Sequence, residues 1–345
     1  MLALLIGGGS LAAASWPGRG NRNQVSCAPG VDLIVRADGT WSCGPRQRPS
    51  GSPSTSPAPS PSSSPGATTP APTPSASSSS TGSTPTGPSA TKPNSGMTNC
   101  MTKLAECGYM HPGNTGVPAG VSLTAYSGPS RITTAGTVID GKTTGCLEIA
   151  AANVVIKNSK ISGPCAFAVK TSSGGSVTVQ DSEIDCVDYK GMGVAGSNAT
   201  TLRSEIRRCE NGFHVNSNVV IQDNYITEVV EVDGGHGDGV QASSGSNVTI
   251  RHNTFNLRNP ITSSMIMDEL VINNLLVEDN FFSAGAYTIY CPDSGTNMVY
   301  RNNRFYGPVG QWSSDPNRPA FGFRTNCGNA TWTGNYRDDN LAAVS

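Results

Sequence analysis

A polar stretch at residues 228–239, EVVEVDGGHGDG, contains Glu231, Asp233, His236 and Asp238. Carboxyl groups and imidazoles act as general acids and bases, and carboxylates also bind Ca²⁺. The simpler explanation for Asp238 is a turn-forming role, because a glycine follows it. The four glycines of the stretch do not indicate a phosphate-binding loop, because no helix is predicted after them. The stretch is therefore a candidate site for acid–base chemistry or cation binding, provided that the fold brings these side chains together.

The elements around this stretch are repeats of one nine-residue phrase. Its copies are NVVIKNSKI (153–161), SVTVQDSEI (176–184), NVVIQDNYI (218–226), NVTIRHNTF (247–255), NLLVEDNFF (274–282), NMVYRNNRF (297–305) and NATWTGNYR (329–337), with a degraded copy ATTLRSEI at 199–206. Successive copies begin 19 to 32 residues apart. A repeat of this length with alternating β-branched residues is typical of stacked supersecondary units.

One column of each phrase holds Asn or Ser. Its members are Ser159, Ser182, Ser204, Asn224, Asn253, Asn280, Asn303 and Asn335. Asn tolerates the left-handed backbone of a sharp bend, and stacked side-chain amides can hydrogen-bond along a stack. An antiparallel sandwich would also have many short strands, but it does not predict a fixed Asn column. We therefore expect an all-β chain in which residues 130–337 form about eight coils of a right-handed parallel β-helix.

The ten cysteines fit this register. Adjacent coils lie one strand spacing apart, about 4.8 Å, so cysteines at equivalent positions of neighbouring coils can be bridged. The expected pairs are Cys146–Cys165, Cys186–Cys209 and Cys291–Cys327 between coils, Cys100–Cys107 in an N-terminal cap, and Cys27–Cys43 in a small leading segment. Such pairing leaves no free nucleophilic thiol and no cysteine zinc site.

The NVTIRHNTF-type repeats and the HGDGVQ motif at 236–241 resemble the pectate-lyase-like superfamily of right-handed parallel β-helix proteins, particularly the secreted bacterial kind. The resemblance covers residues 100–340. The repeats are specific for the fold, whereas HGDGVQ does not name a reaction. In that superfamily the first strand of each coil lines the substrate groove. With Phe213, Val215 and Val240 inward, alternation along the strands predicts an outward row of Glu148, Lys170, His214, Asn216, Gln241, Tyr290 and Arg324.

Two pairs of residues should align between adjacent coils of this groove. GFHVN and DGVQA match residue for residue, so His214 should lie beside Gln241 and Asn211 beside Asp238. The 228–239 stretch would then reach the edge of the groove. The candidate catalytic residues are His214, His236, Asp238, Gln241, Asp233, Tyr290 and Arg324, and the candidate metal ligands are Asp233 and Asp238.

The resemblance makes a polysaccharide lyase acting on an acidic uronate polymer the leading hypothesis. A lyase removes the proton next to a uronate carboxylate, so it needs a base and a cation that neutralises the carboxylate. His214, His236 and Tyr290 could act as bases, and Arg324 or a Ca²⁺ ion on Asp233 and Asp238 could supply the positive charge. The lyase signatures of the superfamily are not clearly present, which leaves the reaction type open.

Two other functions remain open from the sequence. A glycoside hydrolase needs two carboxyl groups flanking the bond, and Asp233 with Asp238 would be the pair, with Glu231 in reserve. The paired-Asp signature of polygalacturonases is absent from the groove segments. A non-catalytic carbohydrate-binding, adhesion or phage-tail β-helix would need only a groove or a rigid rod.

Composition sets the boundaries of the chain. We expect a signal-peptide remnant at 1–20, a small Cys-containing segment at 21–48, a disordered Ser/Pro/Thr-rich linker at 49–96 and the β-helix domain at 97–345. The net charge of -1 and the 14% of charged residues exclude the basic patch of a nucleic-acid-binding protein. We therefore expect a secreted, monomeric protein with a polysaccharide substrate or ligand, no nucleic-acid partner and no membrane span.

Overall fold

The computed structural model describes residues 31–35, 41–45, 93 and 96–345, except 269 and 312. The chain divides into two units, 1–81 and 82–345. In the first unit β1 (Val31–Val35) and β2 (Trp41–Pro45) pair antiparallel. The expected signal-peptide remnant, most of the linker and Cys27 with its predicted bridge lie outside the described residues. Within the described part of the chain, no helix is long and apolar enough to span a membrane.

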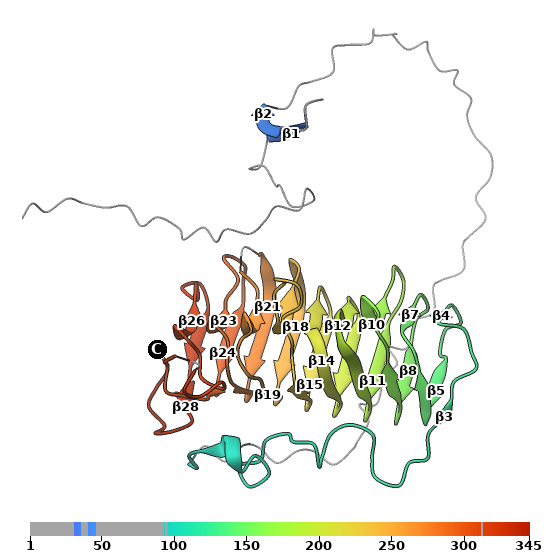
Figure 1. The fold of residues 1–345 in the computed structure, drawn as a ribbon, viewed down its shortest axis with the longest axis horizontal. Helices are drawn as coiled ribbons and strands as arrows, with labels where there is room; N and C mark the ends of the chain where they lie inside the picture. Colours follow the sequence, from blue (N-terminus) through green and yellow to red (C-terminus); the bar gives the residue numbers. More distant parts are fainter. Residues whose placement is uncertain (1–30, 36–40, 46–92, 94–95, 269, 312) are drawn as a thin grey trace, which may run out of the picture. The chain divides into compact units, whose positions relative to one another are not determined.

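The second unit is a stack of parallel coils, each with three strands (Figure 1). The first strands are β4 (Arg131–Ile132), β7 (Leu147–Ile149), β10 (Phe167–Thr171), the second halves of β12 (Glu183–Gly196) and β14 (Glu205–Val215), β17 (Asp238–Ala242), β20 (Ser263–Ile266), β23 (Tyr287–Tyr290) and β26 (Gly322–Thr325). The second strands are β5 (Val138–Asp140), β8 (Val154–Lys157), β11 (Val177–Gln180), β13 (Ala199–Leu202), β15 (Val219–Gln222), β18 (Gly245–Arg251), β21 (Ile272–Glu278), β24 (Met298–Arg301) and β27 (Thr331–Thr333). The third strands are β3 (Thr124–Ala125), β6 (Lys142–Thr144), β9 (Lys160–Ser162), the first halves of β12 and β14, β16 (Tyr225–Thr227), β19 (Thr254–Asn256), β22 (Phe281–Phe282), β25 (Arg304–Phe305) and β28 (Tyr336–Arg337).

The parallel β-helix expected from the repeats is confirmed, and every strand pair between its coils is parallel. Strands β15 and β18, for example, pair in parallel with Val219 beside Val248 and Ile221 beside Ile250. The described second strands form a sheet of nine, one more than the eight phrases predict. The additional strand, β5, belongs to a first coil whose sequence lacks the phrase.

The core consists of the inward residues of all three strand sets. The β-branched residues predicted to face inward, such as Ile156 and Ile250, are fully buried. Aromatic rings stack from coil to coil in the C-terminal half, with ring centroids 4.8 Å apart between Phe255 and Phe282 and 5.5 Å apart between Phe282 and Phe305. Each coil therefore covers the apolar side chains of the next, which is how a repeat too small to fold alone is stabilised.

The Asn/Ser column is a buried hydrogen-bonded ladder, as expected. Asn224 donates from Nδ2 to Asn253 Oδ1 at 3.0 Å, and Asn253 donates in the same way to Asn280 at 3.0 Å. The backbone expectation was wrong by one position. The left-handed conformation occurs at the residue before the ladder, for example at Asp223 (φ 57°) and His252 (φ 52°). The ladder side chain is thereby turned inward, where its amide meets the neighbouring coils.

A second ladder, which the sequence reasoning did not identify, runs along the outside of the stack. It uses the asparagine that opens the phrase. Asn247 donates from Nδ2 to Asn218 Oδ1 at 2.9 Å, and Asn274 donates to Asn247 at 3.0 Å. These asparagines have positive φ, between 57° and 60°, so they satisfy the left-handed bend as well as the stack. The phrase therefore encodes one buried and one exposed amide row.

The disulfide predictions are confirmed for four pairs. The bridges are Cys100–Cys107, Cys146–Cys165, Cys186–Cys209 and Cys291–Cys327. The last three connect consecutive coils, with Cα–Cα distances of 6.4, 4.8 and 5.0 Å. These separations agree with the coil register on which the pairing was based.

Residues 97–123 run alongside the stack before the chain enters the first coil (Figure 1). The amide of Cys100 donates to Asp338 Oδ1 at 2.9 Å, near the C-terminal coil. Further along, the amide of Gly116 donates to the carbonyl of Arg203 at 3.0 Å. This segment therefore contacts coils that are far apart in the sequence.

Candidate functional site

The outward row of the first strands is confirmed over most of its length. Strand register places Lys170 beside Glu148 and, through Ala195, in line with His214. The row continues from His214 to Gln241 and, through Ile266, to Tyr290. The side chains expected to face inward from the same strands, such as Phe213 and Val240, are buried. The first strands therefore present one continuous outward row, which is polar except at Ala195 and Ile266.

The placement of Arg324 was wrong. Tyr290 aligns with Thr325, whereas Arg324 aligns with Ile289, which is fully buried. Arg324 therefore has the inward orientation, and its guanidinium lies 4.7 Å from the centre of the Trp332 ring. The strand of the last coil is shifted by one residue from the alignment that the sequence predicted. Arg324 therefore stacks on Trp332 at the end of the β-helix and does not line the groove.

Gly239 lies close against the core where the site begins. A Cβ atom at Gly239 would lie 2.5 Å from the carbonyl oxygen of Ser264 and 2.6 Å from a ring carbon of Phe255. Only glycine fits so close to the core at this position. Asn211, aligned with Asp238, donates to Gln241 Oε1 at 3.0 Å. The glycine after Asp238 therefore has a structural reason beyond turn formation.

Asp238, the residue directly before Gly239, is fully buried. Its backbone amide donates to Asn211 Oδ1 at 3.1 Å, and Ser263 Oγ donates to its Oδ1 at 2.5 Å. The second carboxyl oxygen, Oδ2, is buried without a hydrogen-bond partner. Burial raises the pKa of Asp238 to about 7, against the lowering effect of Ser263 and with support from the charges of Glu210 and Glu231. The carboxyl group therefore holds a proton below neutral pH.

Glu210 is a second buried carboxyl group at the site, and the sequence reasoning missed it. Only 6% of the residue is exposed, and Oε1 is buried without a hydrogen-bond partner. Gly235 covers it closely, because a Cβ atom there would lie 1.9 Å from that oxygen. Burial raises the pKa of Glu210, while Lys190 and His236 oppose the rise. Glu210 directly precedes Asn211, which aligns with Asp238, and this proximity could have indicated a place in the site. Its burial could not be predicted, because it depends on the 228–237 loop folding over it.

The remaining predicted residues have different environments. Glu231 and Asp233 act on Glu210 as nearby negative charges, so the 228–239 stretch does converge on the site. Asp233 itself is exposed, with a positive φ of 52°. Burial lowers the pKa of His214, which favours its neutral form in the groove. The site therefore contains several carboxyl groups, with Lys190 and His236 nearby.

The proposed Ca²⁺ ligands fit the ion poorly. Ca²⁺ takes six to eight oxygen ligands and prefers ionised carboxylates. Asp238 has one oxygen engaged by Ser263 and is protonated below about pH 7, while Asp233 is exposed on the loop. Among the residues that the structure describes, no group of three or more His, Cys, Asp or Glu side chains is arranged to hold a metal.

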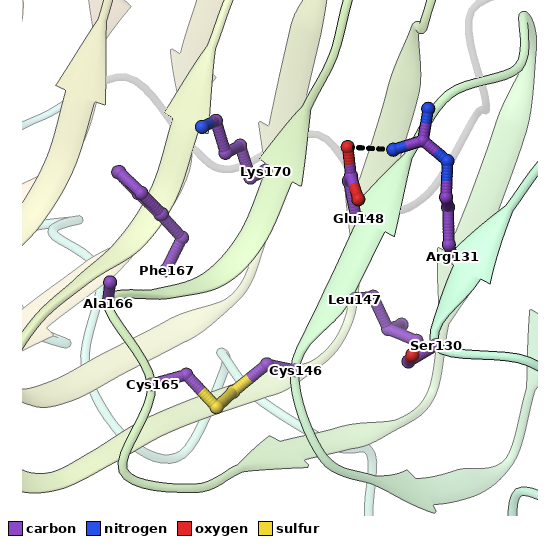
Figure 2. A pocket seen from close by; sticks show the side chains of 9 residues that line it. All are labelled: Ser130, Arg131, Cys146, Leu147, Glu148, Cys165, Ala166, Phe167 and Lys170. Atoms are coloured by element: carbon purple, nitrogen blue, oxygen red, sulfur yellow. Dashed lines mark hydrogen bonds and ion pairs between the residues drawn. A yellow bond between two sulfur atoms is a disulfide. The ribbon is translucent and has the colours of Figure 1, made fainter.

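A hollow of about 390 Å³ lies at the N-terminal end of the same face (Figure 2). Arg131 and Glu148 form an ion pair across it. The ammonium of Lys170 lies 4.5 Å from the centre of the Phe167 ring, and the Cys146–Cys165 bridge borders the hollow. Since these charged groups already have partners, this hollow extends the groove but offers no unpaired carboxyl group for acid–base chemistry.

A comparison with protein-family models agrees with this architecture. The search of curated proteins and the search of solved structures gave no match. Residues 145–305 match a family model described as right handed beta helix region, which includes His214, Glu210 and Asp238. The part of the chain that carries the candidate site is thus a right-handed parallel β-helix.

Proposed function

We propose that the chain is a secreted glycoside hydrolase that cleaves an uncharged polysaccharide in the groove of the first strands. In this proposal Asp238 is the general acid and Glu210 is the second carboxyl group. The observation that carries the proposal is the pair of buried carboxyl groups at one site, each with an oxygen that has no hydrogen-bond partner. The disulfides between neighbouring coils support secretion, because disulfides persist in oxidising compartments.

The environment of Asp238 suits a general acid. A glycosidase acid has to be protonated at the working pH and to transfer its proton to the leaving oxygen, so a raised pKa is required. Burial gives Asp238 a pKa of about 7, and its Oδ2 is the carboxyl oxygen left without a partner. Glu210, the nearby carboxyl group, then activates water or attacks the sugar carbon. Neutral His214 and Gln241 are placed to hydrogen-bond sugar hydroxyls.

The same geometry weighs against the lyase hypothesis. A lyase needs positive charge for the uronate carboxylate, but Arg324 stacks on Trp332 away from the groove. Glu231 and Asp233 place negative charge beside the two buried carboxyl groups, which disfavours an anionic substrate. An uncharged polysaccharide avoids this repulsion.

Substrate access requires the 228–237 loop to move. Gly235 lies directly on the Glu210 carboxyl group, and the loop is attached to the coil by the Val230 amide, which donates to the Cys209 carbonyl at 3.0 Å. In the proposed reaction this loop opens to admit the polymer and the water that hydrolysis consumes.

The proposal is tested by assaying the purified secreted chain on neutral and uronate-containing polysaccharides. We expect new reducing ends from a neutral polymer without the ultraviolet absorbance of an unsaturated sugar. The variant Glu210→Gln should lower kcat by about 100-fold or more, because the second carboxyl function is lost. Glu106→Gln, at an exposed carboxyl group of the N-terminal segment, is the control and should retain full activity. Unsaturated products, or a fully active Glu210→Gln variant, would contradict the proposal.

A further inference from the structure

We infer that Tyr287, Tyr290 and Phe321 form a stacking subsite for an uncharged sugar ring, two to three coils from Asp238 along the same groove. This inference rests on the proposed function in one respect, namely that the groove holds a polysaccharide. It adds a binding position for the uncharged polymer that the carboxyl pair does not define.

The three rings form one cluster, in which Phe321 is exposed and the two tyrosines are partly buried. The centroids of Tyr287 and Tyr290 lie 5.5 Å apart with the ring planes at 84°, and those of Tyr287 and Phe321 lie 6.0 Å apart. Phe321 is 70% exposed, which is unusual for so large an apolar side chain. A hollow of about 290 Å³ next to it is lined by Gln311, Ser313, Ala320 and Phe321. A cluster of aromatic rings that reaches the surface marks binding sites more often than scattered apolar residues do.

Strand register makes this cluster continuous with the carboxyl site. Tyr290 lies two strands from Gln241 in the outward row, which is about 10 Å at the usual strand spacing. The charge of Asp238 reaches Tyr290, since it contributes to the raised pKa that burial gives to the Tyr290 phenol. This separation is close to the length of a disaccharide, so one polymer chain can contact both places.

The sequence leaves room for the cluster. Tyr287 aligns with Gly322 on the next strand, and a Cβ atom at Gly322 would lie 2.9 Å from a ring carbon of Tyr287. A larger residue at this position would push the Tyr287 ring out of place. Glycine therefore allows the tyrosine ring to lie flat against strand β26, beside Phe321.

Backbone hydrogen bonds hold the segment that carries Phe321. Its amide donates to the carbonyl of Ala286 at 2.8 Å, and the amide of Ala320 donates to the carbonyl of Gly285 at 2.9 Å. Asn317 adds a side-chain bond to the carbonyl of Leu257 at 2.7 Å. The rings are thus positioned before a ligand binds, which reduces the entropy lost on binding.

The chemistry of the cluster favours an uncharged sugar. An aromatic face is electron-rich, so it attracts the C–H face of a pyranose ring and not a carboxylate. The nearby polar residues Gln311 and Ser313 are uncharged, and Arg318 already pairs with Asp315 at 3.3 Å. A uronate would find no unpaired cation among these residues.

The test is affinity gel electrophoresis of the whole chain, carried out with soluble xylan, galactomannan, laminarin, hydroxyethyl cellulose, polygalacturonate and alginate. Retardation by at least one neutral polymer is expected, with little retardation by the two acidic polymers. Phe321→Ala should weaken binding about 10-fold while leaving the melting temperature unchanged, because the side chain is mostly exposed. Val138→Ala, at an apolar residue that is 57% exposed on the second sheet, is the matched control and should bind as the wild type does.

The outcomes separate this inference from the proposed hydrolase activity. Wild-type retardation that Phe321→Ala and Tyr287→Ala both leave unchanged would overturn the subsite, whatever the activity. Retardation by acidic polymers alone, or by none of the six, would also overturn it. Binding that is lost in Phe321→Ala would support the subsite even if no polymer were cleaved, and in that case the hydrolase proposal alone would fail.

Discussion

Replacing Asp238 by Asn is expected to abolish activity and, above neutral pH, to stabilise the protein. Burial moves the pKa of this carboxyl from 3.8 to about 7. Because the pKa is higher in the folded than in the unfolded protein, the free energy of unfolding is largest at low pH, where Asp238 is protonated in both. It falls as pH rises from about 4 to about 7. The full difference corresponds to about 4 kcal/mol, at about 1.4 kcal/mol for each pKa unit. The neutral amide keeps an oxygen for Ser263 and never becomes charged.

Chemical denaturation at about pH 4.5 and about pH 8 measures this effect. Asp238→Asn should exceed the wild type by only about 1 kcal/mol at the lower pH, which is close to the ordinary carboxyl pKa, and by several kcal/mol at the higher pH. Turnover should fall by about 100-fold or more. Asp293→Asn, at an exposed carboxyl group, should show neither change. Equal stability of Asp238→Asn and the wild type at both pH values would mean that the carboxyl group is not buried as described.

A stability gain accompanied by loss of activity would identify Asp238 as a functional residue. A residue kept only for folding would not leave a buried acid with an unpaired oxygen, since an amide or an apolar side chain would be more stable there. Proteins often retain such unfavourable groups at active sites. The combination of the two measurements is therefore more informative than either alone.

The fold could be predicted from the sequence because each coil repeats the same local chemistry. The phrase specifies two strands and the bend between them, so the positions of Asn253, of the bridged cysteines and of His214 beside Gln241 followed from alignment alone. The prediction failed where the repeat ends. Arg324 was placed in the outward row because the last coil was assumed to keep the register of the others, and it does not.

The site was less predictable because it depends on tertiary burial. Asp238 was identified by its motif, but its protonation depends on the 228–237 loop and on neighbouring coils. Glu210 lies in an ordinary strand segment, CENGF, and nothing in those letters shows that Gly235 will cover its carboxyl group. The partner of Asp238 was expected to be Asp233, which is in the same loop, but Asp233 is exposed. Sequence proximity was a poor guide to which two carboxyl groups share a buried environment.

Replacing Asn253 by Leu is expected to destabilise the β-helix by about 3 kcal/mol or more. Asn253 is fully buried, and its Nδ2 donates to the carbonyl of Ile221 at 2.8 Å and to Asn280 Oδ1 at 3.0 Å. Its Oδ1 accepts from the backbone amide of Asn224 at 2.9 Å and from the side-chain amide of that residue at 3.0 Å. Leucine has a similar size but would leave all of these buried groups without partners.

Asn253→Ser should have a smaller effect than Asn253→Leu, because serine occupies the same column in the first coils. There Ser204 accepts the backbone amide of Ser182 at 3.3 Å and donates to the carbonyl of Leu202 at 3.0 Å. A serine at 253 can therefore keep one bond to the preceding coil while satisfying its own hydroxyl. Thr249→Leu, on the outer face of the preceding strand, is the control and should change stability by less than about 0.5 kcal/mol. If the serine and leucine variants lose the same free energy of unfolding in chemical denaturation, the ladder stabilises the stack through the amide–amide bonds specifically. If both are as stable as the wild type, the amide row contributes nothing and the stack is held by its apolar core alone.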